Sequence, residues 1–375
     1  DYMCWRENYS KTFYNAHFCL ATEAHREESK AWAKKIPSLQ AEFGLAWMND
    51  NKIHPFDTLS PDLLIDAVES QGFLSDGRFL ALNSYENRVY QIGIEGNKPI
   101  IAKFYRPERW SELQISEEHE FCFQLRDQEL PVVCPLLNAQ GNSISFFKGF
   151  KFALYERKGG HDPELDNLEN LYILGKLLGR FHSIGAIKSF KYRPTLNAYN
   201  FGWQSFEFIS KNFIPQELRA AYDSLAKDVL KNIDQILTDY GPLKNIRVHG
   251  DCHSGNILWR ENNPHFVDFD DSRMAPSIQD LWMLLSGDRQ EQRGQMSELV
   301  EGYNEFYHFD YRELRLIEVF RTLRIMHHSA WIARRWKDPA FPHAFSWFDS
   351  PRYWSDHILS LREQLAVLRE PPIEI

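Results

Sequence analysis

Two carboxylates and one amide stand in an order that suits phosphoryl transfer. The segment V-H-G-D-C-H-S-G-N-I-L-W carries Asp251 and Asn256, and the later segment F-V-D-F-D-D carries Asp268. Transfer of a phosphoryl group needs a carboxylate that orients and deprotonates the acceptor hydroxyl, together with oxygen ligands for magnesium ions that bridge the phosphates. Asp251, Asn256 and Asp268 supply that set. Gly250 and Gly255 allow the tight turns that point the polar side chains of the first segment one way.

Neighbouring residues of the first segment have competing interpretations. Isolated Asp and Asn residues usually form turns or caps, but turn chemistry does not explain three of them in this order. His249 and His253 resemble metal ligands. Since the sequence offers no matched third ligand, we expect them to hold the loop by hydrogen bonds. Cys252 adjoins the proposed base, so its oxidation would silence an enzyme; the simpler interpretation is a small buried side chain.

Composition places the chain among ordinary globular proteins. Its 375 residues are 43% hydrophobic and 25% charged, and its formal charge of −9 argues against non-specific binding to nucleic acid. The five cysteines form no C-x-x-C pair, so a reducing cytoplasm is expected rather than a disulfide framework or zinc site. No apolar run approaches the roughly 18 residues that span a bilayer, and the start lacks the layout of a signal peptide. We therefore expect no membrane partner.

The first half of the chain is expected to be rich in strands. Ser60, a following Pro and a stop at Gly72 predict a short helix. Apolar runs on either side of residues 95–98 predict a β-hairpin. Ser111 begins a second helical stretch. Three further strands are expected in P-V-V-C-P-L-L, S-I-S-F-F and F-K-F-A-L-Y.

The second half of the chain is expected to be mainly helical. Only short strands are expected there, in R-V-H, I-L-W and H-F-V-D-F. Apolar periodicity predicts helices over Leu168–Ile184, Pro215–Leu237, Ile278–Leu285, Tyr311–Trp336 and Tyr353–Arg369. The combination predicts an α+β, two-lobe architecture, with a small β-rich N-lobe and a larger helical C-lobe.

Three regions are expected along the chain. Residues 1–50 form an N-terminal extension of unknown role, in which Ala21–Gln40 could be a short amphipathic helix. Residues 51–157 form the N-lobe, which would bind ATP. Residues 158–375 form the C-lobe, which would hold the catalytic loop, the magnesium site and the acceptor.

From about Phe56 to the C-terminus the sequence resembles a known family. The segments that carry the resemblance are L-N-S-Y-E-N-R-V-Y, K-F-Y-R-P-E-R-W, H-G-D-C-H-S-G-N-I-L-W, D-L-W-M-L-L and R-R-W-K-D-P-A-F-P. They are similar to the bacterial stress response kinase A (YihE/RdoA-type) family. This family belongs to the aminoglycoside-phosphotransferase/choline-kinase branch of the protein-kinase-like fold.

The resemblance implies a role for individual residues. Asp251 would accept the proton, and Asn256 and Asp268 would bind magnesium. Lys103 would contact the ATP phosphates, paired with a glutamate on the next helix. Glu118 has the family spacing for that partner, and the alternatives are Glu117 and Glu120.

Further roles follow from the same resemblance. Ser84 would touch phosphate from the loop that replaces a glycine-rich loop. The segment Tyr155, Glu156 and Arg157 would lie at the lobe connection, where backbone groups meet adenine. Asp280 would brace the catalytic loop. The sequence departs from eukaryotic protein kinases, because Gly replaces Arg in H-R-D and D-F-D replaces D-F-G, so the activation-loop switch that uses this Arg is in doubt.

We therefore expect a kinase that uses ATP and Mg²⁺. The resemblance implies serine or threonine hydroxyls of proteins as acceptors, in a bacterial stress response, and we expect a monomer. The alternative is a small-molecule kinase acting on an aminoglycoside, choline or homoserine-like alcohol, because such enzymes share the motif. A third interpretation is a catalytically idle nucleotide-binding module. Arg334 and Arg335, in a segment rich in aromatic residues, could receive phosphate or carboxylate groups of an acceptor.

Overall fold

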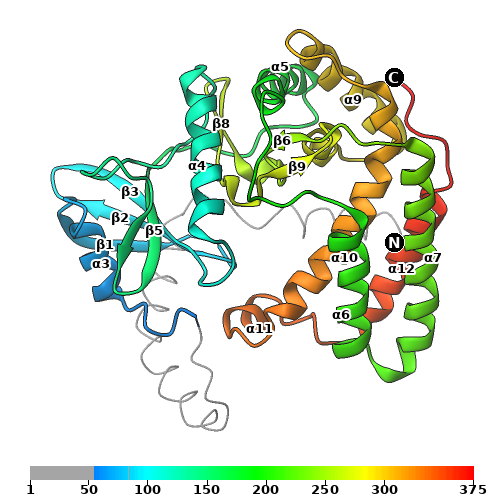
Figure 1. Ribbon diagram of the computed structural model, residues 1–375, viewed down its shortest axis with the longest axis horizontal. Coiled ribbons are helices and arrows are strands. Elements are labelled where there is room, and N and C mark those ends of the chain that lie inside the picture. Colours follow the sequence, from blue (N-terminus) through cyan, green and yellow to red (C-terminus); the bar gives the residue numbers. More distant parts are fainter. Residues whose placement is uncertain (1–54, 83) are drawn as a thin grey trace.

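The computed structural model describes residues 55–82 and 84–375 (Figure 1). The expected extension at residues 1–50, including the helix proposed at Ala21–Gln40, lies outside the described residues. The described chain has the expected α+β architecture of two lobes. A sheet with two helices forms the smaller lobe, and helices with short strand pairs form the larger one.

The N-lobe is built on one five-stranded sheet. Its order is β1-β2-β3-β5-β4, and every neighbouring pair is antiparallel. Lys103 lies on the central strand, opposite Val89 on one side and Ala153 on the other. The strands are β1 Ser75–Ala81, β2 Arg88–Ile94, β3 Asn97–Phe104, β4 Ser145–Phe147 and β5 Phe150–Glu156.

Both expected helices of the N-lobe are present, and both begin at a capping side chain. In α3 (Pro61–Glu69), Ser60 accepts a hydrogen bond from the amide of Leu63. In α4 (Glu112–Asp127), Ser111 forms a reciprocal capping box with Gln114. A capping residue satisfies backbone amides that have no partner within the helix, which is why the sequence located these starts.

One of the strands expected in the N-lobe is wrong. The segment P-V-V-C-P-L-L is extended but pairs only through single residues, Val132 with Phe266 and Pro135 with Tyr155. Two prolines remove ladder donors there, which limits pairing. The strand β1 was not expected, because four of its seven residues are polar or glycine. The expected hairpin is confirmed, with its turn at Glu95 and Gly96.

The C-lobe contains the expected helices and others that were not expected. The first six residues of the long segment at Tyr311–Trp336 form a 3₁₀ helix, Tyr311–Leu316, before α10 begins. The helices α6, α9 and α11 were not expected. The elements are α5 Leu168–Gly185, α6 Gln204–Asn212, α7 Gln216–Tyr240, β6 Ile246–Val248, β7 Ile257–Arg260, β8 Asn263–Phe266, β9 Arg273–Ala275, α8 Ile278–Leu281, α9 Arg289–Asn304, α10 Ile317–Arg334, α11 Ala340–Ala344 and α12 Pro351–Val367.

Helices α5 and α9 cross at very short range because glycines line their contact. A Cβ atom built on Gly175 would lie 2.1 Å from the carbonyl oxygen of Leu299, and one on Gly179 would lie 2.4 Å from that of Tyr303. Both positions exclude any side chain. This crossing supports the core on which the catalytic loop rests.

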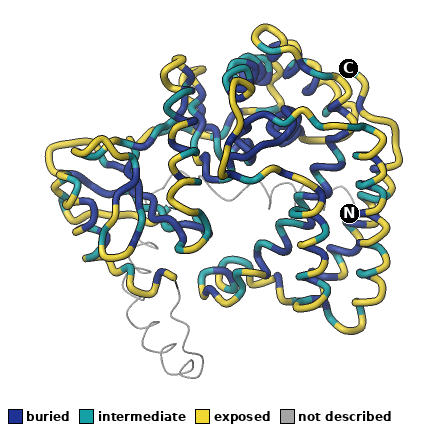
Figure 2. The backbone as a smooth tube through the Cα atoms, viewed as in Figure 1, coloured by how far each residue is buried: buried dark blue, intermediate teal, exposed yellow. Residues whose placement is uncertain are grey.

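Helix α4 packs its apolar side into the core of the C-lobe. Phe121 makes edge contacts with Phe181 of α5 and with Phe269, which follows β8. Figure 2 shows the inner face of α4 buried where it meets the C-lobe. The helix that carries Glu118 is therefore held by the C-lobe as well as by the N-lobe.

Candidate phosphotransfer site

Asp280 holds the catalytic loop through its backbone. Its two carboxylate oxygens accept hydrogen bonds from the amides of His249 and Gly250, each at 2.8 Å, and from His182 Nε2 at 3.1 Å. All four residues are buried. Gly250 has φ +84°, and a Cβ there would lie 2.2 Å from the carbonyl oxygen of Asp271, so only glycine fits. The loop is thus fixed one residue before Asp251.

Asp251 lies in a basic environment. Arg324 Nη1 of α10 lies 2.6 Å from its Oδ1, and His253 Nε2 lies 3.6 Å from its Oδ2. Burial opposes ionisation, but the charges of Arg324 and His253 outweigh it and hold the pKa of Asp251 well below its usual value. The carboxylate is therefore ionised, as a group that accepts a proton from a hydroxyl must be.

The two imidazoles of the loop form hydrogen bonds, as the sequence predicted. His249 Nε2 lies 2.9 Å from the carbonyl oxygen of Val267, and His253 Nδ1 accepts from the amide of Gly255. Cys252 is completely buried, and burial raises the pKa of its thiol well above the usual value. Since thiolate and access are both needed for oxidation, the idea that Cys252 makes the site redox-sensitive is not supported.

Asn256 and Asp268 fit the oxygen-rich donor set that magnesium prefers. Asn256 Nδ2 donates to the carbonyl oxygen of Asp251 at 2.9 Å, which leaves Oδ1 of the amide as the end available to a cation. The side chain of Asp268 is 53% exposed. Within residues 55–82 and 84–375, no group of three or more His, Cys, Asp or Glu side chains is arranged to hold a metal by itself. An ion here would need phosphate oxygens as further ligands.

Lys103 reaches from β3 to the C-lobe. Its Nζ lies 2.8 Å from Asp268 Oδ1 and 3.4 Å from Asp270 Oδ1, and its side chain is only 7% exposed. Burial opposes the charge, but Asp268 and Asp270 outweigh it and raise the pKa of Lys103 well above its usual value. The ammonium is therefore charged and is held between two carboxylates of the C-lobe.

Glu118, the residue expected to pair with Lys103, is buried on α4. Its side chain lies 3.3 Å from Arg193 Nη1, and burial raises its pKa to about 7 although Lys103 and Arg193 oppose this. Among the described residues, the ion pairs of Lys103 are with aspartates. Glu117 instead accepts from the backbone amides of residues 191–193, and Glu120 pairs with Lys188.

Besides Arg324, two further residues of the site were missed by the sequence reasoning. Asp270 is buried, receives a hydrogen bond from Asn87 at 3.1 Å, and pairs with Arg109. Arg109 also lies 3.0 Å from Asp271 Oδ1. The signal was present in the doubled acid of F-V-D-F-D-D and the arginine of P-E-R-W, but nothing in either segment indicated that they would meet.

The loop between β1 and β2 is tied to the C-lobe through Glu86. Its Oε2 accepts from Trp331 Nε1 at 2.6 Å and lies 2.5 Å from Arg335 Nε. Its Oε1 lies 3.0 Å from Arg106 Nε. Ser84, the expected phosphate contact, lies half-buried in the same loop. The aromatic and basic segment of α10 thus joins the two lobes.

The segment expected to meet adenine lies at the end of β5. Tyr155 turns its hydroxyl inward, 3.2 Å from the hydroxyl of Tyr105. Glu156 is paired with Lys158, and Arg157 Nε donates to Gln91 Oε1. Tyr155 and Arg157 thus contact the N-lobe, and Glu156 contacts the first residue of the C-lobe.

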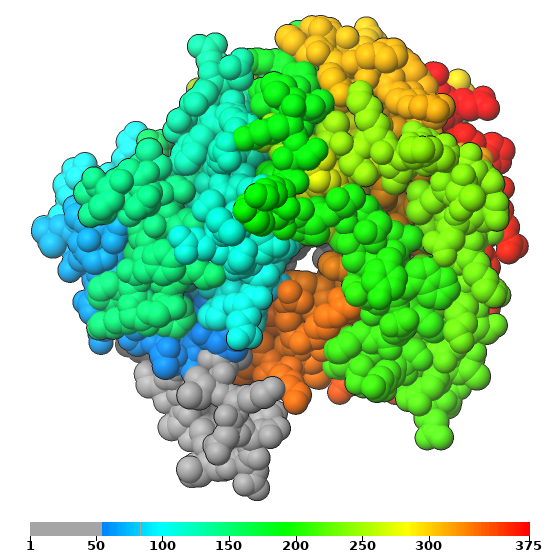
Figure 3. Space-filling model, in the orientation of Figure 1, coloured from blue at the N-terminus to red at the C-terminus, as the bar shows by residue number. Residues whose placement is uncertain are grey.

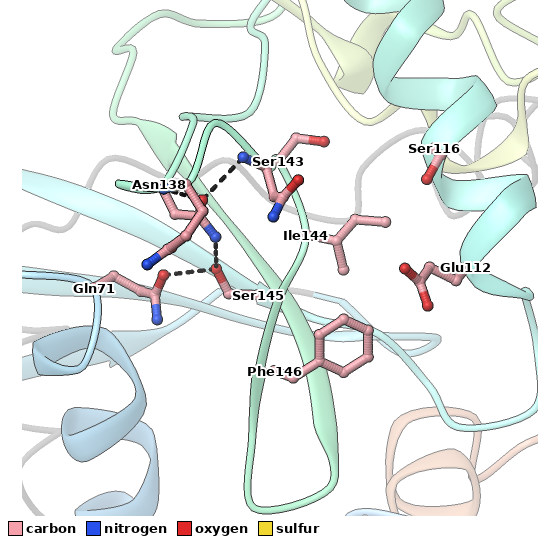
Figure 4. A pocket seen from close by; sticks show the side chains of 10 residues that line it. Gln71, Glu112, Ser116, Asn138, Ser143, Ile144, Ser145 and Phe146 are labelled. Atoms are coloured by element: carbon pink, nitrogen blue, oxygen red, sulfur yellow. Dashed lines mark hydrogen bonds between the residues drawn. The ribbon is translucent and has the colours of Figure 1, made fainter.

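A separate polar cavity of about 460 Å³ lies between the start of α4 and the segment that leads into β4 (Figure 4). Ser143 in its wall lies 2.7 Å from His119 Nδ1, and His119 Nε2 lies 2.7 Å from the hydroxyl of Tyr105. In another part of the wall, Asn138 Nδ2 donates to Ser145 Oγ, which donates in turn to Gln71 Oε1. None of the residues of the phosphotransfer site lines it.

The comparisons with known proteins agree with this geometry. Residues 78–317 match the phosphotransferase enzyme family. The chain is 41% identical over 330 residues to a protein of Salmonella typhimurium named serine/threonine protein kinase RdoA, covering 88% of this chain and 99% of that protein. It is 43% identical over 336 residues to stress response kinase A of Escherichia coli O157:H7, covering 87% and 98%.

Solved structures share the fold at low identity. The amicoumacin kinase hAmiN, in complex with AMP-PNP and Ca²⁺, has a TM-score of 0.63 at 20% identity and covers 82% of this chain and 93% of its own. Spectinomycin phosphotransferase APH(9)-Ia, with ADP and spectinomycin, has a TM-score of 0.56 at 17% identity and covers 81% and 98%. No helix of the described residues is long and apolar enough to cross a bilayer. The chain belongs to the phosphotransferase enzyme family and, within it, to the stress response kinase A proteins.

Proposed function

We propose that this kinase transfers the γ-phosphoryl group of ATP to serine or threonine hydroxyls of proteins, with Mg²⁺, in a bacterial cytoplasm under stress. The observation that carries the proposal is the contact between Lys103 and Asp268, beside the loop of Asp251 and Asn256. This arrangement supports a triphosphate held by the lysine and an acceptor hydroxyl facing the ionised carboxylate. The name of one relative, serine/threonine protein kinase RdoA, supports a protein acceptor.

Each residue would contribute positioning or charge. Lys103 would bind phosphate oxygens after exchanging its carboxylate partners for them. Asn256 Oδ1 and Asp268 would hold magnesium, which when bound neutralises charge on the phosphates. Asp251 would orient the acceptor hydroxyl and take its proton. Fixed dipoles and charges of this kind need no reorganisation during the reaction, which is the main source of catalysis in phosphoryl transfer.

The test is transfer from ATP labelled in its γ-phosphate. We expect autophosphorylation or phosphorylation of a protein acceptor on serine or threonine, mapped by mass spectrometry, and loss of both when Mg²⁺ is chelated. The same reaction is run with spectinomycin, kanamycin, choline and homoserine. Faster transfer to one of these alcohols than to any protein would replace the proposal with a small-molecule kinase. ATP binding without transfer to any acceptor would favour an idle module.

A further inference from the structure

One face of α10 faces the site. Arg324, near the middle of the helix, forms the ion pair with Asp251, and Trp331, two turns on, binds Glu86 of the loop between β1 and β2. Residues at spacings of three, four and seven share a helix face. His327 lies between these two on that face. Figure 3 shows the molecule hollowed between the N-lobe, the orange segment of α10 and α11, and the green segment of α6.

Basic groups gather on this face around one aromatic ring. His327 stacks on Phe201 with ring centroids 4.0 Å apart, and the guanidinium of Arg273 from β9 lies 4.8 Å from the same ring. Arg334 at the end of α10 is exposed, lies over the ring of Phe208 and donates to a backbone carbonyl of α6. Aromatic faces and a carbonyl hold these groups in place.

Carboxylates do not balance this charge. Arg324 pairs with Asp251, which also lies near His253. Arg273 and Arg109 both pair with Asp271. Within the described residues Arg334 forms no ion pair. We define the basic acceptor face as Arg273, Arg324, His327 and Arg334.

The positive charge of the basic acceptor face acts on the pKa of His327. Burial lowers its pKa first, and Arg273, Arg334 and Arg324 lower it further. Three guanidinium groups therefore act on one side chain, one turn of α10 from the arginine that pairs with Asp251. A second cation brought into this hollow would be repelled, and an anion would be attracted.

We propose that the basic acceptor face selects a peptide acceptor that carries carboxylate or phosphate groups next to the receiving serine or threonine. The inference rests on the proposed function and names its substrate class. An anionic side chain beside the hydroxyl would pair with Arg334, which is exposed, while the hydroxyl meets Asp251. Arg273 is buried and paired with Asp271, so it would add positive charge beneath this face without contacting the acceptor. Cationic amino alcohols lack that complementarity. Acidic residues and phosphorylated residues share the required chemistry, and the experiment separates them.

The test uses four peptides that differ only in the residues flanking one serine. These are aspartates, phosphothreonines, glutamines or lysines. We expect kcat/KM to be highest for an anionic peptide and lowest for the lysine peptide, with a ratio of about tenfold or more. Raising the salt concentration should shrink the ratio, because exposed charges are screened. The ranking of the aspartate and phosphothreonine peptides identifies which anion is preferred.

Two variants assign the effect to the basic acceptor face. Arg334→Gln should reduce the ratio of kcat/KM for the anionic peptide to kcat/KM for the lysine peptide about two- to fivefold. The change should appear in KM for the peptide and not in KM for ATP. Arg352→Gln on α12, whose side chain is 83% exposed, is the matched control and should leave the ratio unchanged. Asp251→Asn should bind a fluorescent aspartate peptide more tightly than the wild type, since Arg324 loses its carboxylate.

The outcomes separate this inference from the function on which it rests. Equal rates for the aspartate and lysine peptides, in a protein that phosphorylates itself, would overturn the inference alone. An Arg334→Gln variant that changes KM for ATP but not for the peptide would do the same, because the face would then serve the nucleotide. Absence of transfer to every peptide and to the protein itself would overturn the proposed function.

Discussion

Lys103 Nζ and Asp268 Oδ1 lie 2.8 Å apart although 165 positions separate them in the chain. One residue comes from the central strand of the N-lobe sheet and the other from the segment after β8. Asp268 has φ +58°, in the left-handed region that side chains other than glycine seldom occupy. Such a conformation persists where surrounding contacts determine it, and it turns this carboxylate toward the other lobe.

Replacing Asp251 by Asn should reduce turnover at least about a hundredfold, because the positioned proton acceptor is lost. Binding of Mg-ATP should stay within about twofold, since the residues expected to hold it are unchanged. Steady-state kinetics and calorimetry measure the two effects. Asp239→Asn, on the exposed side of α7, is the control. Near-wild-type transfer by Asp251→Asn would remove the assigned role.

Replacing Asp268 by Ala should have opposite effects with and without magnesium. With Mg²⁺, the affinity for ATP should fall about tenfold or more, because a metal ligand is lost. Without Mg²⁺, the affinity should hold or rise, because Lys103 loses the carboxylate that competes with phosphate. Titration calorimetry under both conditions decides the matter. Equal weakening in both would show that Asp268 acts on the fold and not on a cation.

Replacing Asp280 by Asn should loosen the catalytic loop. The two backbone amides bond to different carboxylate oxygens, so in the same place the Nδ2 of an asparagine would face the amide of either His249 or Gly250, donor against donor. We expect the free energy of unfolding to fall on the order of 2–4 kcal/mol, and turnover to fall with it. Urea denaturation measures the first effect. Asp228→Asn, exposed on α7, should change neither quantity.

Gly179 and Gly294 should respond oppositely to alanine. A methyl group on Gly179 meets the carbonyl oxygen of Tyr303 at 2.4 Å, whereas one on Gly294 meets nothing within 4 Å. Gly179→Ala should therefore destabilise by about 1–3 kcal/mol, as overpacking does. Gly294→Ala, on the exposed face of α9, should stabilise by up to about 1 kcal/mol. Thermal unfolding of both variants, followed by circular dichroism, compares them directly.

Glu118 should give the protein a stability that declines as pH rises. Burial raises its pKa from 4.5 to about 7, so between these values the folded protein keeps a proton that the unfolded chain has released. Stability should fall across that interval and level off above it, by roughly 3 kcal/mol at most. The difference between wild type and Glu118→Gln at each pH isolates this effect from that of the buried histidines. A pH-independent difference would contradict it.

The sequence predicted what is encoded locally. Asp251 and Asn256 lie in one short loop, where the Asn256 side chain donates to the Asp251 carbonyl, so the motif alone predicted that they lie together. The starts at Ser60 and Ser111 were found because a capping side chain lies next to the turn that it stabilises. Lys103 alone would have been ambiguous, and the resemblance made it a candidate.

Contacts across the fold could not be predicted in this way. Arg324 lies 73 positions after Asp251, and nothing in the sequence distinguishes it from the other arginines of α10 as the partner of that aspartate. Asp270 became visible only when Arg109 and Asn87 were seen to meet it. The segment P-V-V-C-P-L-L has the composition of a strand, yet its prolines leave it pairing through single residues. Spacing along the chain does not report which charges share one enclosed space.

The contacts of Glu86 with Trp331 and Arg335 should slow the release of nucleotide. With this loop over the phosphates, as the resemblance implies, ADP would leave only when the loop lifts, and lifting would break the contacts of Glu86, which is 8% exposed. We expect departure of the nucleotide, rather than the bond exchange, to set the pace of each cycle. A rapid first round of phosphate transfer followed by a slower steady rate, seen in quenched-flow traces, would reveal that bottleneck.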